Sequence, residues 1–133
     1  MTKEDKELLL KDLSARLLYK PIVHAEWDYR DEPPYYKLKH AEADRTLEIN
    51  DFYAIWNVKP YLRPMSSMTD EEKFRFNHLD LLNYENDGFE MANYRQIDWL
   101  NAYHFDYRGL IEKGLALEAP EGMYNFSKKI VSK

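Results

Sequence analysis

Four histidines can bind a metal ion or carry a proton near neutral pH: His24, His40, His78 and His104. Two of them stand in a His-x-Asp spacing, His78 with Asp80 and His104 with Asp106. Side chains two residues apart on a helix point about 200° apart, so neither pair binds one metal ion while it is helical. A pair at a helix end escapes this objection, and His104 with Asp106 could be such a case. His24 and His40 either face each other across two paired strands or lie on opposite faces.

The usual catalytic motifs are missing from the sequence. Ser66 and Ser67 lack the flanking glycines of a Gly-x-Ser-x-Gly nucleophile elbow. The four glycines are not spaced as a phosphate-binding loop, and the absence of cysteine excludes disulfides, thiol catalysis, zinc-thiolate sites and iron–sulfur clusters. Helix first turns and solvated loops explain the acidic pairs, which are Glu71-Glu72, Asp31-Glu32 and Glu85/Asp87. We therefore predict no catalytic residue, no metal ligand and no cofactor, which disfavours an enzyme.

The composition predicts a soluble globular domain. The chain has 133 residues, of which 44% are apolar and 32% charged, and this is enough to bury a core. The formal net charge of −5 argues against broad electrostatic binding to nucleic acid. Aromatic residues reach 15%, and the eleven tyrosines suit half-buried surfaces and interfaces. The charged amino terminus does not read as a signal peptide and no apolar run is long enough to span a bilayer, so we expect a cytoplasmic location.

Hydrophobic periodicity predicts a helix and then strands in the first half of the chain. Thr2 and Asp5 form a capping-box pattern at the start of an amphipathic helix. The apolar stripe of this helix consists of Leu9, Leu10, Leu13 and Leu17. From Ile22 the period changes to two, and the expected inner face of this strand carries Val23, Ala25, Trp27 and Tyr29. A loop over residues 31–34 ends the strand.

Two further strands are expected before the middle of the chain. One covers residues 36–41, and the other covers 46–50 with Leu47 and Ile49 on its inner face. Because the three strands follow one another through short connections, they predict an antiparallel meander. Residues 52–56 are apolar on both faces and fit either a buried strand or a helical turn.

Two prolines and a capping box predict the secondary structure of the second half of the chain. Pro60 and Pro64 each fix φ and disfavour helix in the preceding residue, so the segment around them is expected to be extended. Thr69 and Glu72 form a capping box that begins a helix over 70–82, with Phe74, His78, Leu81 and Leu82 on one side. A second helix is predicted over 90–104.

The end of the chain is expected to return to the sheet. Asp106 is placed to cap a short piece over 107–113, which Gly114 would end, and residues 115–117 would rejoin the strands. The predicted fold is a single α+β domain over residues 1–126. It consists of an amino-terminal helix, a three- or four-stranded antiparallel sheet and two or three carboxyl-terminal helices. Residues 127–133 form a basic tail.

One stretch resembles a known signature. The run Lys59–Thr69, Lys-Pro-Tyr-Leu-Arg-Pro-Met-Ser-Ser-Met-Thr, resembles a Lys-Pro-x-Leu-Arg-Pro-Leu/Met-Ser-x-Met/Leu-Thr signature. We associate this signature with small proteins of gut Bacteroidales genomes, phages and mobile elements. The runs 98–102 and 104–117 are similar to the carboxyl-terminal half of the same family, so the resemblance covers residues 58–124. It implies a bacterial or phage cytoplasmic protein, and it transfers no site residue because that family has no established activity.

Three functional hypotheses follow. The first is a small non-enzymatic protein-interaction (accessory) protein, whose expected contact residues are Tyr61, Arg63, Tyr107 and Arg108. The second is a single-stranded nucleic-acid-binding protein, since alternating aromatic and basic side chains can stack bases and hold phosphates. The third is a metal-dependent hydrolase that uses His104 and Asp106. We expect a protein partner and no membrane contact, while the net charge disfavours nucleic acid; the sequence does not predict an oligomeric state.

Overall fold

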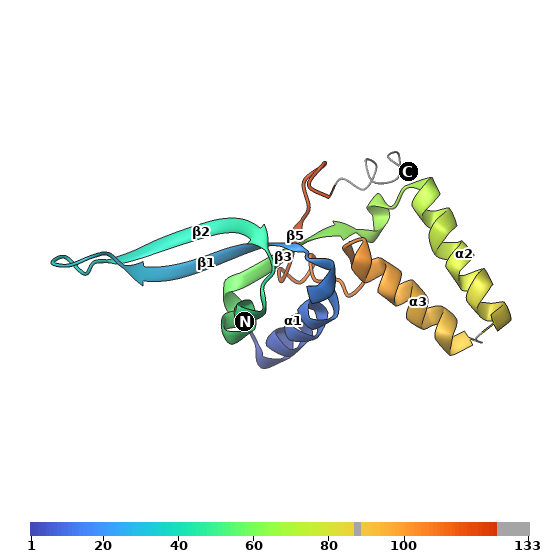
Figure 1. Ribbon diagram of the computed structural model, residues 1–133, viewed down its shortest axis with the longest axis horizontal. Coiled ribbons are helices and arrows are strands. Elements are labelled where there is room, and N and C mark those ends of the chain that lie inside the picture. Colours follow the sequence, from blue (N-terminus) through green and yellow to red (C-terminus); the bar gives the residue numbers. More distant parts are fainter. Residues whose placement is uncertain (87–88, 125–133) are drawn as a thin grey trace.

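The computed structural model describes residues 1–86 and 89–124 and has the predicted α+β architecture. Figure 1 shows a long β-hairpin projecting at one end, a pair of helices at the other end, and a third helix against the middle of the sheet. The predicted basic tail, 127–133, lies outside the described residues. The elements in chain order, with η for a 3-10 helix, are α1 (Lys3–Arg16), η1 (Leu17–Tyr19), β1 (Ile22–Arg30), β2 (Leu38–Thr46), η2 (Ile49–Asn57), β3 (Val58–Pro64), η3 (Met65–Ser67), α2 (Asp70–Asn86), α3 (Phe89–Ala102), β4 (Phe105–Asp106) and β5 (Leu117–Glu118).

The helix α1 begins at the predicted capping box. The hydroxyl of Thr2 accepts a hydrogen bond from the Asp5 N–H at 3.0 Å, and the Asp5 carboxylate accepts one from the Thr2 N–H at 3.3 Å. Leu9 and Leu13 are fully buried, whereas Leu10 is exposed. The apolar stripe is therefore narrower than predicted. The core cluster that it joins also contains Val23, Ala25, Leu47, Ile55, Val58, Leu62, Leu110, Leu115 and Ala116.

The sheet is mixed, which corrects the expectation of a purely antiparallel one. Its strand order is β2-β1-β3-β4, and β5 also pairs with β3. The pairs β1–β2 and β1–β3 are antiparallel, while β3–β4 and β3–β5 are parallel. A parallel pair needs a long crossover connection, and the excursion through α2 and α3 supplies one between β3 and β4.

The strand predicted over 46–50 does not exist. β2 is one continuous strand that ends at Thr46; Leu47 is buried as expected, but Ile49 is 70% exposed. The chain turns into η2 because the Asp51 carboxylate accepts a hydrogen bond from the Glu48 N–H at 2.9 Å and binds Arg45 at 2.6 Å. The open question about residues 52–56 is thus decided for a helical turn.

The extended segment around the two prolines is confirmed as β3. Pro60 is buried and lies opposite Val23 of β1. After β3, the capping box at α2 is also confirmed, with the Thr69 hydroxyl accepting from the Glu72 N–H at 3.1 Å and the Glu72 carboxylate accepting from the Thr69 N–H at 2.9 Å. The same carboxylate oxygen accepts a hydrogen bond from Arg63 Nη2 at 2.8 Å, so one side chain joins the cap of α2 to β3.

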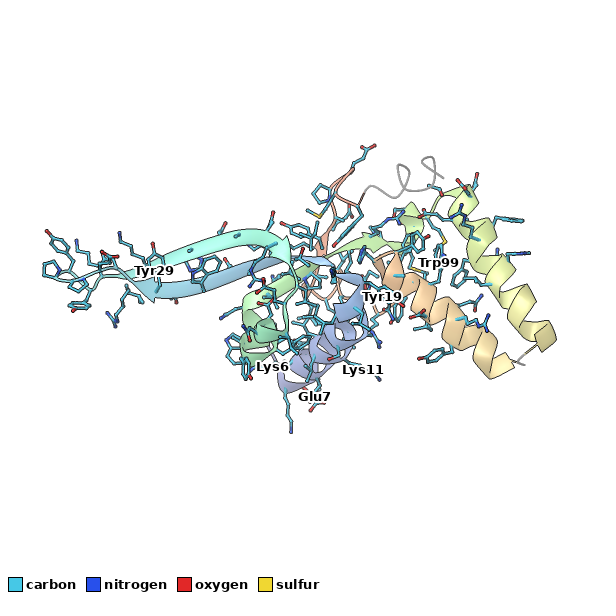
Figure 2. The ribbon with its side chains drawn as sticks, in the orientation of Figure 1. Lys6, Glu7, Lys11, Tyr19, Tyr29 and Trp99 are labelled. Carbon is cyan, nitrogen blue, oxygen red and sulfur yellow. The ribbon has the colours of Figure 1, made fainter. Side chains whose placement is uncertain are left out.

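The helices α2 and α3 pack through a second cluster, which contains Met68, Leu100 and Phe105 with the rings of Phe76, Trp99, Tyr103 and Tyr107 against it. Trp99 stacks on Phe105 at 5.8 Å between ring centroids, and Figure 2 labels Trp99 where α3 approaches α2. The prediction that Phe74 and His78 lie on one side of α2 is confirmed by the stacking of their rings, and this side is exposed. Phe74 is 68% exposed and stacks on His78, because Phe76 takes the inward position. The side chains at 81 and 82 lie outside the described residues.

The predicted helical piece over 107–113 is a set of turns. Asp106 therefore caps no helix, but its two carboxylate oxygens hold the turns by accepting hydrogen bonds from Leu110 N–H at 2.9 Å and Ile111 N–H at 3.0 Å. Gly114 ends the piece with φ of +77°, a left-handed conformation that glycine adopts without strain. The chain then returns to the sheet as β5, as predicted.

A buried ion pair connects α1 to β4. Asp12 and Arg16 have no exposed side-chain surface, and Arg16 Nε donates to Asp12 at 2.9 Å. Arg16 Nη2 also donates to the carbonyl oxygen of Phe105 at 2.6 Å, and Arg108 Nε donates to Asp12 at 3.2 Å. The pair therefore joins the two hydrophobic clusters through hydrogen bonds.

We predict that Asp12→Ala lowers the free energy of unfolding by about 3–5 kcal/mol, because it leaves the Arg16 guanidinium buried without its carboxylate. Urea unfolding followed by circular dichroism measures this change. The matched control is Glu7→Ala on the same helix, whose side chain points away from the body of the protein (Figure 2). Equal stabilities of the two variants would contradict the structural role of the pair.

A second prediction concerns the pH dependence of stability. Burial acts to raise the pKa of Glu72, but its bonds to Arg63 and to the Thr69 N–H hold this pKa below the ordinary value of 4.5. Glu72→Gln should therefore cost about 1–2 kcal/mol at neutral pH. A lowered carboxyl pKa stabilises the fold above pH 4.5, so the difference between wild type and variant should disappear as the pH falls through the folded-state pKa.

Urea titrations between neutral pH and pH 3 measure this difference. The control is Glu71→Gln, because Glu71 forms an exposed bond to Arg75 and should change stability by less than about 0.5 kcal/mol. A difference between wild type and Glu72→Gln that persists unchanged to the lowest pH would contradict the assignment.

Candidate functional site

The β1–β2 hairpin stands out from the body of the protein (Figure 1). Its two strands pair along their whole length, from Ile22 opposite Thr46 to Arg30 opposite Leu38. Within residues 1–86 and 89–124, the covered part of the hairpin is its base, where Val23 and Ala25 join the core. At the tip, the loop is closed by Asp31, whose N–H donates to the Lys37 carbonyl at 3.0 Å and whose carboxylate accepts from the Lys37 N–H at 2.7 Å.

One face of the hairpin is aromatic and uncovered. Successive side chains of a strand point to opposite faces, and beyond the buried Ala25 the register places together a set that we call the aromatic face: Trp27, Tyr29, Lys39, Ala41 and Ala43. Trp27 is 42% exposed and Tyr29 is 45% exposed. Figure 2 shows Tyr29 near the outer end of the hairpin, away from every helix. The predicted inner face of this strand is thus correct at its base and wrong beyond Ala25.

The opposite face carries a repeated motif. The sequence His-Ala-Glu-x-Asp occurs at 24–28 in β1 and again at 40–44 in β2. Antiparallel pairing sets each histidine opposite an aspartate and the two glutamates opposite each other. We call these six side chains the His–carboxylate ladder: His24, Glu26, Asp28, His40, Glu42 and Asp44.

The bonds within the ladder follow the same symmetry. His24 Nδ1 lies 2.7 Å from Asp44 Oδ1, and His40 Nδ1 lies 2.9 Å from Asp28 Oδ1. The other nitrogen of each ring faces the glutamates: His24 Nε2 is 3.8 Å from Glu42, and His40 Nε2 is 3.4 Å from Glu26 and 3.8 Å from Glu42. Both imidazoles are therefore held by an aspartate and turned towards a central pair of glutamates.

These contacts shift the ionisation of the ladder. The hydrogen bond to Asp28 is the main cause that raises the pKa of His40 above 6.5. The hydrogen bond from His24 is the main cause that lowers the pKa of Asp44, and the hydroxyl of Tyr61 donates a second bond to that carboxylate at 3.0 Å. With four carboxylates around two imidazoles, the ladder gives this face of the hairpin a negative charge.

The contact residues predicted from the sequence are not brought together in one surface. Tyr61 lies beside the ladder, in a hollow of about 300 Å³ that His24, Glu26 and Trp56 also line. Arg63 binds Glu72, and its guanidinium lies 4.1 Å from the centroid of the Phe105 ring. It lines a different hollow, of about 420 Å³.

Tyr107 and Arg108 lie together on a third part of the surface. Arg108 Nη2 donates to the Tyr107 hydroxyl at 3.1 Å, and that hydroxyl donates to Asn101 at 2.8 Å. Arg108 also binds Asp12 and lines a hollow of about 240 Å³ between α1 and α3. The assignment of Tyr61, Arg63, Tyr107 and Arg108 as contact residues stays a prediction.

The histidines of the two His-x-Asp spacings lie elsewhere. His104 is buried with a positive φ of +64° and stacks on Tyr124 at 4.0 Å between ring centroids. Asp106 uses its carboxylate to bind backbone N–H groups, as described above. His78 lies on an exposed part of α2. Among the described residues, the group that could hold a metal ion is His24, Glu26 and Glu42, all in the hairpin.

Reasoning from the sequence missed the ladder although its signal is visible. The first copy of His-Ala-Glu-x-Asp falls in a predicted strand, where residues two apart share a face, but the second begins in the strand predicted over 36–41 and runs past its end, because β2 continues to Thr46. His24 and His40 neither stand directly opposite each other nor lie on opposite faces of the hairpin. They share one face, separated by four positions along the paired strands, and each stands opposite an aspartate.

Comparisons of the chain with protein-family models, with curated proteins and with solved structures find no match. Among the described residues, no helix combines the length and apolar character that crossing a membrane requires. The functional argument therefore rests on the geometry of the hairpin.

We predict that an NMR titration of the His40 ring gives a pKa above 6.5, and that Asp28→Asn returns it towards this value because the acceptor loses its charge. The control is Glu32→Gln, which removes an exposed carboxylate at the hairpin tip and should leave the His40 pKa unchanged. Identical titrations of wild type and Asp28→Asn would show that Asp28 does not hold this ring.

Proposed function

We propose that this protein is a non-enzymatic protein-interaction module whose contact surface is the β1–β2 hairpin. The observation that carries the proposal is the aromatic face, which a projecting hairpin presents without any covering element in the described part of the chain. Trp27 lies opposite the small Ala41, so its ring is accessible from the side as well as from above, and Tyr29 lies opposite Lys39. Trp and Tyr are the side chains that most often dominate binding energy at protein interfaces.

The edge of the hairpin gives the partner a way to bind. β2 is the outermost strand, and no other strand pairs with its outer edge in residues 1–86 and 89–124. An extended segment of a partner can pair there through main-chain hydrogen bonds. Alternate side chains of the added strand would then lie on the aromatic face and on the face of the His–carboxylate ladder.

The charge of the ladder specifies the partner further. Its four carboxylates attract basic side chains, and the chain as a whole has a formal net charge of −5. The occupant that fits both faces is therefore a protein segment in an extended conformation with alternating basic and apolar residues. A bacterial or phage cytoplasm as its setting remains part of this proposal and rests on the resemblance of residues 58–124.

The nucleic-acid alternative is less well supported by the geometry. Tyr61 donates its hydroxyl to Asp44 of the ladder, so the carboxylates next to it would repel phosphates. Arg63 is bonded to Glu72 rather than directed towards a ligand. The hydrolase alternative rests on His104 and Asp106, both of which are buried.

A labelled peptide tests the proposal directly. A peptide of about ten residues that alternates lysine and valine matches the length of β2, and a control peptide carries the same residues in two blocks. By fluorescence anisotropy, we expect the alternating peptide to bind at least about tenfold more tightly than the control peptide. The variant Trp27→Ser/Tyr29→Ser should weaken binding about 30-fold, the effect of losing about 2 kcal/mol at an interface hot spot.

The matched control variant is Phe74→Ser/Tyr94→Ser, which removes two exposed aromatic rings from α2 and α3 and should leave peptide binding unchanged. Equal binding of both peptides, or full binding by Trp27→Ser/Tyr29→Ser, would disprove the proposed surface. Loss of binding in Arg63→Ala and Tyr107→Ala instead would move the contact surface to the body. Binding of a single-stranded oligonucleotide at about 50 mM salt would favour the nucleic-acid alternative.

A further inference from the structure

The centre of the His–carboxylate ladder has the donor geometry of a metal site. One nitrogen of His24 and one carboxylate oxygen each of Glu26 and Glu42 all lie within 4.8 Å of one another. Atoms bonded to a single Zn²⁺ at about 2.0–2.2 Å lie about 3.3–3.6 Å apart at tetrahedral angles. Small rotations of these partly exposed side chains would bring the donor atoms from within 4.8 Å to the separation that a bound ion requires.

His40 provides a fourth donor. Its Nε2 is 3.4 Å from Glu26 Oε1 and 3.8 Å from Glu42 Oε2, so it contacts both glutamates although it lies outside the group of three within 4.8 Å. The two histidines approach the glutamate pair from opposite ends of the hairpin segment, as the antiparallel register requires. Two imidazole nitrogens and two carboxylate oxygens complete a four-coordinate set.

The aspartates orient the two rings for metal binding. An ionised carboxylate only accepts hydrogen bonds, so the bonds from Nδ1 of His24 to Asp44 and from Nδ1 of His40 to Asp28 place the ring proton on Nδ1. In the neutral ring, which is the form that binds a metal ion, each Nε2 then carries its lone pair on the side of the glutamates. Metal-binding histidines are held in this way by a carboxylate behind the ring, and an ordinary acidic surface has no need of it.

The register adds an independent observation. Glu26 and Glu42 stand directly opposite each other, and like charges in this position destabilise a pair of strands. A divalent cation between them removes the repulsion and balances their two charges. From the donors, the held rings and this opposed pair we propose that His24, His40, Glu26 and Glu42 bind one divalent transition-metal ion of the Zn²⁺ type, with Asp28 and Asp44 as positioning residues.

The mixed donor set decides the class of metal. Imidazole nitrogen suits zinc and its transition-metal neighbours, whereas Mg²⁺ and Ca²⁺ prefer oxygen ligands alone. The site lies on a hairpin of two paired nine-residue strands, so its ligands are carried by regular strands rather than by a loop.

Isothermal titration calorimetry with Zn²⁺, on full-length protein purified without a histidine tag, tests the site. We expect one Zn²⁺ per chain and no comparable binding of Mg²⁺. Asp28→Asn and Asp44→Asn should each weaken Zn²⁺ binding about 10- to 100-fold, because the rings lose the groups that hold them. His24→Ala/His40→Ala should remove the binding, and His78→Ala, which changes an exposed histidine outside the hairpin, should not affect it.

Titration with Co²⁺ gives a second readout, because a four-coordinate nitrogen and oxygen site produces visible absorption that loosely bound Co²⁺ lacks. We expect this absorption in wild type and in His78→Ala, and its loss in His24→Ala/His40→Ala. Circular dichroism shows whether each variant is folded, and Glu26→Gln provides a milder change of the same site if the double variant is not.

Three results would overturn the proposal: binding that survives in His24→Ala/His40→Ala, equal binding of Mg²⁺ and Zn²⁺, or no binding by folded wild type. None of these measurements uses a protein partner, so their outcome is independent of the peptide experiment above.

Discussion

The pairing of β3 along both of its edges is the constraint on which the rest of the structure depends. β3 pairs antiparallel with β1 and parallel with β4 and β5, and adjacent residues Leu62 and Arg63 bind β5 and β4 on opposite edges. The Arg63 N–H donates to the His104 carbonyl at 2.7 Å, and the Ala119 N–H donates to the Leu62 carbonyl at 2.8 Å, so residues from two distant segments are fixed to one strand. Because β1 is aligned by β3, the direction in which the hairpin leaves the body is set by the same strand.

Two hydrophobic clusters lie on either side of a buried ion pair. One cluster gathers α1 against the sheet, and the other packs α2 and α3 against β4. Arg16 of α1 donates a hydrogen bond to the carbonyl of Phe105, and Asp12 balances its charge. These hydrogen bonds connect the two hydrophobic clusters. Burying these charges is costly, and their bonds make one relative arrangement of α1 and β4 far more favourable than others.

Both functional proposals concern the same hairpin, and a single register produces its two faces. Pairing of β1 with β2 places Trp27 opposite Ala41 and Tyr29 opposite Lys39 on one side. On the other side it sets the two His-Ala-Glu-x-Asp motifs against each other. A cation bound in the ladder would reduce the negative charge that a basic partner meets. Metal and partner would therefore influence each other through electrostatics across a hairpin that is only two strands wide.

The sequence by itself determined the features that depend on neighbouring residues: the α+β class, the capping boxes at Thr2 and Thr69, the extended β3 and the turn at Gly114. Their hydrogen bonds or backbone angles are contained within a few residues, so a local pattern is enough to predict them. Only the tertiary structure decided that Trp27 and Phe74 are exposed, that β4 and β5 join β3 in parallel, and that two distant copies of one motif form a ladder. Burial and strand register depend on what the rest of the chain brings alongside, and no local pattern contains that information.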